Sequence, residues 1–217
     1  MDVSALLRSG VALVPGPVGR MEVHVDAPNQ SPRGIALIAH PQPLLGGSAA
    51  HKIPHLLARG VRDAGWLAAR PNFRGVGASE GVHDRGEGET DDLVAAVGLL
   101  RDAYPNLPLS LIGFSFGAFV QSRVAQRLLE AEAPATHVVL LGLPVGEVEG
   151  GSRHYATGRV PHQTLLVHGE FDEAAPLSAL FDWARPLSLP VVVLPGADHF
   201  FSGHLPLLRS LIVQSLR

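Results

Sequence analysis

The stretch of sequence that decides the fold is LSLIGFSFGAFV, residues 109–120. Its first half, Leu109–Phe114, is a short apolar run of the kind that forms a buried strand, and Phe116–Ala131 is predicted as a helix. Ser115 joins the two and has a glycine two residues to either side, so the chain reads strand, tight turn, helix. The Gly-x-Ser-x-Gly pattern alone is a weak signal in a chain with 24 glycines, so its position between strand and helix carries the prediction.

The same alternation of short apolar runs and longer amphipathic stretches extends over the rest of the chain. Further strands are predicted at Gly34–His40, Gly65–Phe73, His137–Leu143, Thr164–Gly169 and Pro190–Leu194, preceded by two at Val11–Val14 and Arg20–Ala27. Further helices are predicted at Ala49–Ala64, Glu89–Tyr104, Pro176–Ala184 and Gly203–Leu216. Continuously apolar strands that alternate with helices are typical of a parallel sheet buried on both faces. We therefore predict an α/β fold: a mostly parallel central sheet with helices on both faces, formed by a single domain over residues 1–217.

Composition and charge exclude several classes of protein. Apolar residues make up 46% of the chain and charged residues 17%, as in a folded globular protein rather than a disordered one. The formal net charge is −3 and no lysine-arginine cluster stands out, which argues against a nucleic-acid partner. No apolar run is long enough for a membrane span, and Asp2 and Arg8 do not fit a signal peptide, so we expect a cytoplasmic protein. The absence of cysteine excludes disulfides and a cysteine nucleophile.

Ser115 is the candidate nucleophile. A serine in a strained turn between strand and helix projects its hydroxyl above the sheet. Gly113 and Gly117 remove side chains that would collide where the strand and the helix pass closely. Phe116 follows at the start of the helix, where its backbone N–H can point at a developing oxyanion. In a parallel sheet, ligands bind beyond the carboxyl ends of the strands, so the partners of this serine are expected just after other strands.

The partners of a nucleophilic serine are an acid and a histidine. The histidine takes the hydroxyl proton, the acid orients the histidine, and in this type of fold both follow the serine in the chain. The segment TLLVHGEFD, residues 164–172, runs from a strand into a polar loop, where Asp172 is the favoured acid and Glu170 and Glu173 are rivals. We interpret His168, at the end of the strand, as a packed structural histidine.

Two histidines, His199 and His204, follow the candidate acid. His199 lies in the loop PGADHFF, residues 195–201, directly after the last predicted strand, and is the candidate base. His204 is expected in the first turn of the final helix, where it would point elsewhere. Asp198 is adjacent to His199, and because adjacent side chains point apart, we interpret it as a loop-capping residue.

A second oxyanion donor is expected from the loop after Gly34–His40. Because Pro41 has no N–H, the backbone N–H of Gln42 is the favoured donor. The N–H of Leu44 and the pair Gly46-Gly47 are alternatives.

Taken together, these segments resemble the α/β-hydrolase superfamily, and most closely short bacterial serine hydrolases and esterases near the dienelactone-hydrolase branch. The resemblance covers nearly the whole chain and rests on HPQP (40–43) with GG (46–47), NFRGVGASEG (72–81), GFSFG (113–117), HGEFD (168–172) and GADHFF (196–201). It implies a triad of Ser115, Asp172 and His199. Similar proteins often carry a second histidine where this chain has Gln42. The expected role of the backbone N–H of residue 42 does not depend on that side chain. The loop Arg74–Ser79 matches a family loop and is interpreted either as a border of the site or as a structural turn.

The activity implied by this resemblance is ester-type hydrolysis. We expect cleavage of small to medium carboxylic esters through an acyl-enzyme; thioesterase, peptidase or acyltransferase activity with the same triad, or a non-catalytic binding protein of this fold, are the alternatives. The segment Pro144–His162 is short and interrupted by glycines, which predicts an open site without a multi-helix lid. Apolar walls of the site are expected from residues that are equally suited to the core: Phe116, Leu44, Leu45, Phe200 and Phe201.

No metal or other cofactor is expected. The eleven histidines form no H-E-x-x-H or similar ligand spacing. His51 and His55 are four residues apart on a predicted helix, but they have no acidic third ligand nearby, so we interpret them as surface or interface residues.

Overall fold

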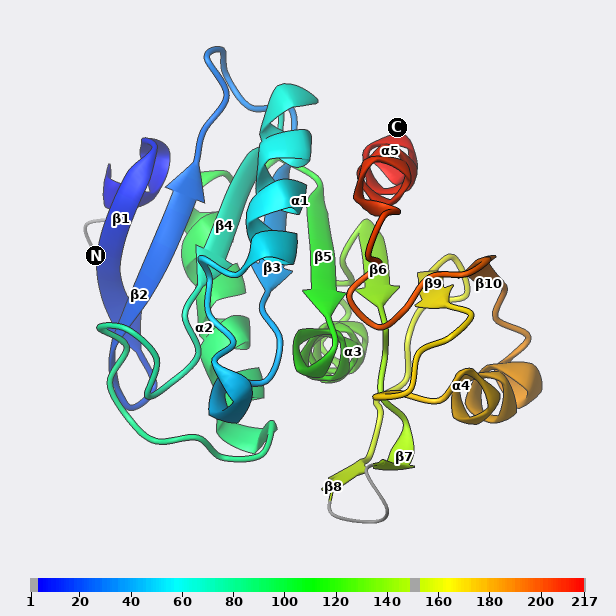
Figure 1. Cartoon of the computed structure of the whole chain (residues 1–217). Coiled ribbons are helices and arrows are strands. Elements are labelled where there is room, and N and C mark those ends of the chain that lie inside the picture. Colours follow the sequence, from blue (N-terminus) through cyan, green and yellow to red (C-terminus); the bar gives the residue numbers. More distant parts are fainter. Residues whose placement is uncertain (1–3, 149–152, 217) are drawn as a thin grey trace.

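The computed structural model describes residues 4–148 and 153–216, and within these ranges the central feature is an eight-stranded sheet between layers of helices (Figure 1). The strands lie in the order β1-β2-β4-β3-β5-β6-β9-β10. Their bounds are Gly10–Gly16 for β1, Gly19–Asp26 for β2, Ile35–Ala39 for β3, Leu67–Pro71 for β4, Leu109–Phe114 for β5, His137–Leu141 for β6, Leu165–Gly169 for β9 and Val191–Leu194 for β10. Strand β2 pairs antiparallel with both of its neighbours, and the other pairs are parallel. The predicted mostly parallel α/β sheet is confirmed.

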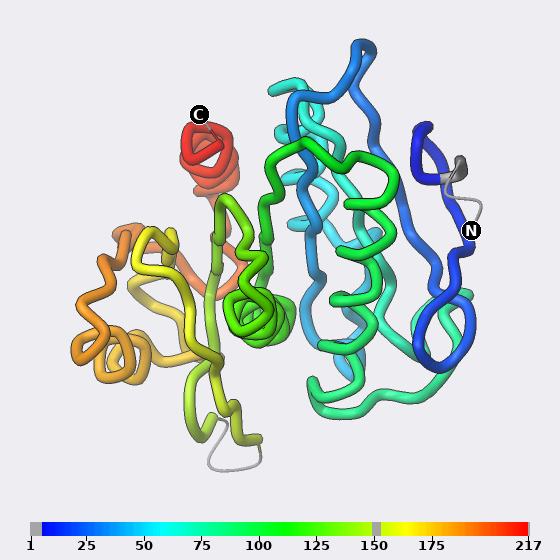
Figure 2. The backbone as a smooth tube through the Cα atoms, turned by 180° about the vertical axis from the view of Figure 1, so that it is seen from behind, coloured from blue at the N-terminus to red at the C-terminus, as the bar shows by residue number. Residues whose placement is uncertain are grey.

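Helices cover both faces of this sheet. Helices α1 (Lys52–Asp63) and α5 (Leu205–Ser215) pack on one face, and α2 (Glu87–Ala103), α3 (Phe116–Glu130) and α4 (Leu177–Ala184) pack on the other (Figure 2). The sheet therefore separates two apolar cores, and successive residues of a strand enter them in turn. In the part of the chain that the structure describes, no helix has the length and apolar character needed to cross a bilayer.

The strands at the centre of the sheet are buried along their whole length, as their continuous apolar sequences predict. Every residue of β3, β4 and β5 is buried. Arg70 of β4 is the charged residue among them. Its Nη2 lies 2.7 Å from Oδ2 of Asp26 on β2, and its Nη1 donates to the carbonyl of Ala49. A buried guanidinium is tolerated there because a carboxylate and a carbonyl satisfy its donors.

The predicted helices and strands of the sheet are all present, with boundaries that differ by a few residues. The helix expected over Ala49–Ala64 begins at Lys52, because Nδ1 of His51 accepts a hydrogen bond from the N–H of Ile53 and caps the first turn. The helix expected from Glu89 begins two residues earlier, at Glu87.

A small hairpin between β6 and β9 was not predicted from the sequence. It consists of β7 (Gly146–Val148) and β8 (Arg153–Tyr155), which pair antiparallel apart from the main sheet. The described residues of the segment Pro144–His162 contain this hairpin and no helix, which agrees with the prediction that a multi-helix lid is absent.

The strand order determines where the loops converge. The chain passes from β3 to β4 on one side and then returns to place β5 on the other side of β3, so the order reverses around β3. The carboxyl ends of parallel strands on either side of such a reversal form the usual ligand crevice. In Figure 1 this edge of the sheet faces down, toward the hairpin β7–β8.

Candidate active site

Ser115 occupies the sharp turn between β5 and α3. Its φ of 56° and ψ of −123° lie in a region that residues with a side chain rarely adopt. Two sets of hydrogen bonds hold this conformation: the N–H of Ser115 donates to the carbonyl of Leu141 at 2.8 Å, and its own carbonyl accepts from the N–H groups of Ala118 and Phe119. The hydroxyl is thereby presented at the carboxyl edge of the sheet, as the motif predicts.

The two glycines of the motif are required by close packing. A Cβ at Gly113 would lie 2.4 Å from the carbonyl oxygen of Gly117, and a Cβ at Gly117 would lie 2.4 Å from the carbonyl oxygen of Ala39 on β3. Both distances are far below van der Waals contact, so the strand and the helix can pass this closely only without side chains there.

A hydrogen-bonded relay connects Ser115, His199 and Asp172. Nε2 of His199 lies 2.9 Å from Oγ of Ser115, and its Nδ1 lies 2.7 Å from Oδ2 of Asp172. Because a carboxylate only accepts hydrogen bonds, the proton of the neutral ring belongs on Nδ1, and Nε2 is left to accept the serine hydroxyl. The three side chains follow β5, β10 and β9, so the structure brings together the three residues predicted from chain order.

Asp172 is held in place by its surroundings. Its Oδ1 accepts a hydrogen bond from the N–H of Ala175 at 2.7 Å, and the residue is 5% exposed. The buried ring of His168 lies beneath it, with Nε2 2.7 Å from the carbonyl of Ala175 and 3.3 Å from Oδ2 of Asp172. Burial lowers the pKa of His168, so the ring is neutral. His168 is therefore a packed structural histidine, as interpreted from the sequence.

The rival acidic residues are engaged elsewhere or exposed. Glu170 accepts a hydrogen bond from the N–H of Gly196, and Glu173 is exposed to solvent. Asp198 caps its own loop by accepting from the N–H of Ser202 at 2.9 Å, a hydrogen bond that lowers the pKa of Asp198. Asp172 is the carboxylate that contacts the histidine ring.

His199 is positioned by aromatic neighbours and by a glycine. Its ring lies 5.2 Å from that of Phe114 and 5.3 Å, edge to face, from that of Phe200. A Cβ at Gly142, after β6, would approach the ring to 3.3 Å, so a glycine there leaves room for the imidazole. His204 caps the start of α5, and its Nδ1 contacts the carbonyl of Ser202, away from the relay.

The loop after β3 contains the proposed oxyanion donor and its alternatives. It includes the short 3-10 helix η2 (Pro43–Leu45). The N–H of Leu44 donates to Oε1 of Gln42, that of Gly46 donates to the first residue of η2, and that of Gly47 donates to the carbonyl of Gln42. Hydrogen bonds within the loop therefore occupy the alternative donors, which leaves the N–H of Gln42 as the candidate. Phe116 is the first residue of α3, where helical N–H groups lack a partner within the helix.

The side chain of His40 holds the loop after β3 in place through two hydrogen bonds. Its Nε2 accepts a hydrogen bond from the N–H of Phe73 at 3.0 Å, so the ring proton lies on Nδ1, which donates to the carbonyl of Pro41 at 2.7 Å. Burial lowers the pKa of His40 to about 4, which keeps the ring neutral.

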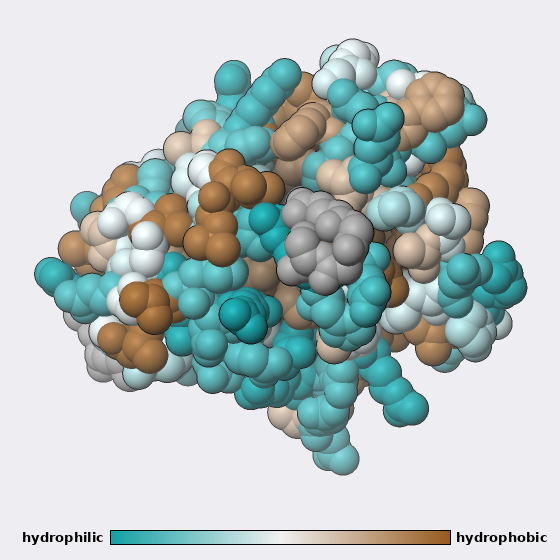
Figure 3. Space-filling model, turned by 60° about the horizontal axis from the view of Figure 1, so that its bottom comes forward, coloured by the Kyte–Doolittle hydropathy of each residue, from teal (hydrophilic) through white to brown (hydrophobic). Residues whose placement is uncertain are grey.

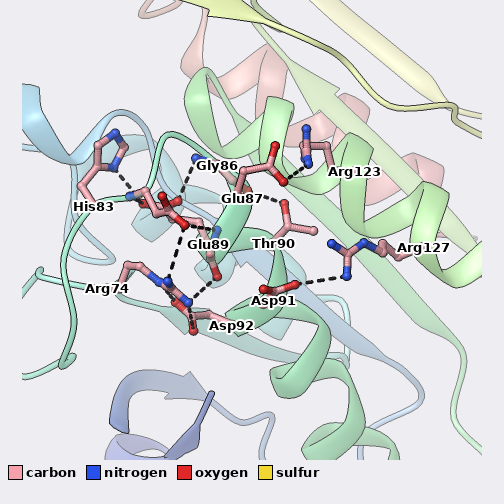
Figure 4. Close-up of polar contacts among 12 residues, drawn as sticks. Arg74, His83, Gly86, Glu87, Glu89, Thr90, Asp91, Asp92, Arg123 and Arg127 are labelled. Carbon is pink, nitrogen blue, oxygen red and sulfur yellow. Dashed lines mark hydrogen bonds and ion pairs between the residues drawn. The ribbon is translucent and has the colours of Figure 1, made fainter. Parts of the chain in front are cut away.

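The loop Arg74–Ser79 has the role of a structural turn. The side chain of Ser79 donates to the carbonyl of Asn72 and accepts from the N–H of Glu22. Figure 4 shows Arg74 facing Asp92 of α2, with its Nε 2.7 Å and its Nη2 2.8 Å from the two carboxylate oxygens. These contacts attach the turn to β2 and α2.

A small cavity of about 120 Å³ opens beside the relay. Leu45 and Phe200 line it, as predicted, and Leu44 lines a second cavity next to it. The expectation for Phe201 is corrected: this residue is 0% exposed and packs between the sheet and α5, because its backbone turns with a φ of 53° and directs the ring inward. Figure 3, with the strand-end face brought forward, shows apolar patches on a largely polar surface.

Other residues of the cavity were missed in the sequence. From the sequence, His51 was interpreted as a surface or interface residue; in the structure it lines the cavity, and its ring stacks 6.0 Å from that of Phe114. Val148 and Tyr155 reach the cavity from the hairpin β7–β8. His51 follows the loop after β3, and this position in the sequence could have indicated that it lies near the site. Among residues 4–148 and 153–216, no cluster of three or more histidine, cysteine or acidic side chains is arranged to hold a metal ion.

Comparison with known proteins identifies the family. A structure of an α/β serine hydrolase homologue from Coxiella burnetii is 33% identical, covers 97% of this chain and 99% of its own, and has a TM-score of 0.83. An α/β serine hydrolase without a lid from Xanthomonas campestris is 32% identical, covers 97% of this chain and 94% of its own, and has a TM-score of 0.85.

An uncharacterised protein of Rickettsia prowazekii (strain Madrid E) is 31% identical over 194 residues, which is 86% of this chain and 79% of that protein. No protein-family model matches the sequence. On the basis of these similarities, the chain belongs to the α/β serine hydrolases.

Proposed function

We propose that this protein hydrolyses small to medium carboxylic esters through an acyl-enzyme formed on Ser115. The observation that supports this proposal best is the relay of hydrogen bonds, 2.9 Å from Ser115 to His199 and 2.7 Å from His199 to Asp172. A serine hydroxyl at this distance from a correctly oriented imidazole has the arrangement needed for attack on an acyl carbon.

In the first half of the proposed reaction, Oγ of Ser115 bonds to the ester carbonyl carbon while its proton moves to Nε2 of His199. The N–H groups of Gln42 and Phe116 stabilise the charge on the carbonyl oxygen. The tetrahedral intermediate then breaks its bond to the alcohol oxygen, and His199 returns the proton to that oxygen. Asp172 stays ionised and orients the imidazolium.

In the second half, water takes the place of the alcohol. His199 accepts a proton from the water as its oxygen bonds to the acyl carbon, and the bond to Ser115 then breaks with return of the proton to Oγ. One ester and one water yield one carboxylic acid and one alcohol, and the enzyme is regenerated.

The size of the cavity beside His199 favours substrates with a small alcohol group. Its volume of about 120 Å³ is well below the ~300–1,000 Å³ typical of sites for drug-sized ligands. Leu45 and Phe200 are 68% and 53% exposed and give its mouth an apolar rim. We therefore expect esters of short-chain alcohols to be better substrates than esters of long-chain alcohols.

The proposal is tested with short p-nitrophenyl esters and a fluorophosphonate probe. Wild-type protein is expected to turn over the esters and to be labelled by the probe. Ser115→Ala is expected to lose labelling and to reduce kcat by roughly 10⁴-fold or more, because the nucleophile is absent.

The matched control is Ser210→Ala, which removes an exposed hydroxyl on α5. It is expected to behave as the wild type. Labelling or turnover that persists unchanged in Ser115→Ala would move the nucleophile to another residue, and a wild type that neither reacts nor is labelled would refute the hydrolase proposal.

A further inference from the structure

A second and larger cavity lies directly beside the first. Its volume is about 380 Å³, and the two cavities share the lining residues Gln42, Arg153 and Tyr155. Phe116 and Leu44 contribute apolar walls to the second cavity. A molecule bound at Ser115 can therefore extend from the first cavity into the second.

The charged residues that line the second cavity are cationic. They are Arg85 and Arg153, and no carboxylate is among its described lining residues. In the described part of the chain, Arg85 has no hydrogen-bond or ion-pair partner within the protein. An unpaired guanidinium at the wall of a cavity offers several donors to an anion, and its fork geometry matches a carboxylate.

Arg85 is held on a firmly anchored loop. The fully buried carboxylate of Glu89 accepts hydrogen bonds from the N–H groups of Asp84 and Gly86, at 2.9 and 2.8 Å. Figure 4 shows Glu89 beside Gly86 and beside the ring of His83, whose Nδ1 lies 2.8 Å from the same carboxylate. These contacts hold the backbone on either side of Arg85 beside the cavity.

The backbone of this loop is strained at Arg85 itself. Its φ is 52°, and that of the following Gly86 is 102°. An arginine in this conformation costs about 1 kcal/mol or more, and the anchored turn holds it there. The nearby carboxylate of Asp84 is turned toward α2, where it accepts from the N–H of Gly88 at 3.1 Å.

The position of the cavity indicates which part of an ester it meets. His199, which would protonate the leaving alcohol, lines the first cavity and not the second. Of the two residues proposed to bind the carbonyl oxygen, Gln42 lines both cavities and Phe116 lines the second. The alcohol departs beside His199, so the acyl chain extends to the opposite side, over the second cavity.

We propose that the second cavity binds a carboxylate at the far end of the acyl chain, and that Arg85 recognises it. The substrates would then include half-esters of dicarboxylic acids, in which one carboxyl group is esterified and the other is free. This inference rests on the proposed ester hydrolysis and specifies its substrate class.

The test compares two ethyl esters with acyl chains of equal length, monoethyl adipate with a terminal carboxylate and ethyl hexanoate with a terminal methyl group. Release of ethanol is measured for wild type, Arg85→Gln and Arg85→Lys. We expect wild type to prefer monoethyl adipate in kcat/KM, and Arg85→Gln to reduce that preference on the order of tenfold, mainly through KM. Arg85→Lys is expected to retain part of the preference, since it keeps the charge but not the fork.

The matched control is Arg185→Gln, which removes an exposed arginine that lines neither cavity and pairs with Asp182 at 2.8 Å. It is expected to leave both esters unaffected. Lysine and glutamine each carry a Cβ, so the backbone strain at position 85 is the same in all variants. No preference for monoethyl adipate in wild type, or equal effects of Arg85→Gln on both esters, would overturn the inference.

Binding without turnover separates this inference from the proposed function. Monoethyl adipate is titrated calorimetrically into Ser115→Ala and into Ser115→Ala with Arg85→Gln. Binding that weakens about tenfold in the double variant supports the carboxylate site even if no ester is hydrolysed. Turnover of ethyl hexanoate that depends on Ser115, without binding of monoethyl adipate, would refute the carboxylate site and leave the hydrolase proposal intact.

Discussion

The backbone of Ser115 adopts φ 56° and ψ −123°, a conformation that a residue with a Cβ adopts at a cost of about 1–3 kcal/mol. Glycine has no such cost, yet it would lack the hydroxyl that lies 2.9 Å from His199. The fold therefore stores strain at the residue that supplies the proposed nucleophile, and stability and activity oppose each other at this position.

We expect Ser115→Gly to be more stable than Ser115→Ala by on the order of 1 kcal/mol, although both are inactive. Both variants lose the hydroxyl, but alanine keeps the Cβ and with it the strain, while part of the gain from glycine is offset by its more flexible unfolded chain. Urea unfolding of the two purified variants measures the difference. Equal stability of the two variants would contradict the prediction, because the strain would then be no larger than the unfolded-state cost of glycine.

The candidate acid and base of the site could be predicted from the sequence because the chain order of the fold restricted the choice. Asp172 and His199 follow strands and come after Ser115 in the required order, so few candidates remained for each. The neighbouring Phe200 and Phe201 could not be separated in this way, because a loop has no periodicity to show which ring faces the core. One ring lines the cavity and the other is fully buried.

At the scale of elements, the loop after β3 and the start of α3 are the segments whose backbone N–H groups are proposed to contribute directly to the chemistry. Gln42 has φ −51° and ψ 117°, a conformation that proline also adopts. This coincidence allows the N–H of residue 42 to be removed without a change of backbone direction.

We expect Gln42→Pro to lower kcat for a short ester by roughly 10²–10³-fold, because it removes one donor to the oxyanion. Gln42→Ala keeps the N–H and removes only the side chain, so it is the matched control and should retain most of kcat. Steady-state kinetics of both variants, with circular dichroism to confirm the fold, measure the difference. Equal losses in both variants would assign the oxyanion contact to another group.

Elements were predictable in proportion to their burial. A strand such as β5 is buried on both faces, so all of its residues except Ser110 are apolar and the run is visible in the sequence. The hairpin β7–β8 gives no such signal, because each strand has three residues, lies outside the main sheet and alternates in burial. Its pairing depends on contacts that a local sequence pattern does not contain.

At the scale of the whole molecule, buried histidines couple stability to pH. Burial lowers the pKa of His40 to about 4 and also lowers that of His168, His51 and His137. In the unfolded chain a histidine takes up its proton near pH ~6.5, so below that pH the unfolded state binds more protons than the folded one. Stability from these neutral rings is fully present above about pH 6.5 and is lost as pH falls below it, and for His40 the loss extends down to about pH 4.

For His40 alone this loss amounts to about 3 kcal/mol between about pH 6.5 and pH 4. We expect the free energy of unfolding to fall over this window, and His40→Gln to flatten the fall even though it destabilises the protein at every pH. His55→Gln, which changes an exposed histidine of α1, is expected to leave the slope unchanged. Urea unfolding at several pH values measures all three slopes, and an unaltered slope in His40→Gln would contradict the assignment.

The hairpin β7–β8 contributes to the shape of the cavity but contains none of the proposed reacting groups. The proposed reacting groups follow β3, β5, β9 and β10, while Val148 and Tyr155 of the hairpin form cavity walls. The two short strands pair with each other apart from the main sheet. Descendants of this gene can therefore exchange the hairpin and acquire new substrates while the reacting groups pass unchanged from one generation to the next.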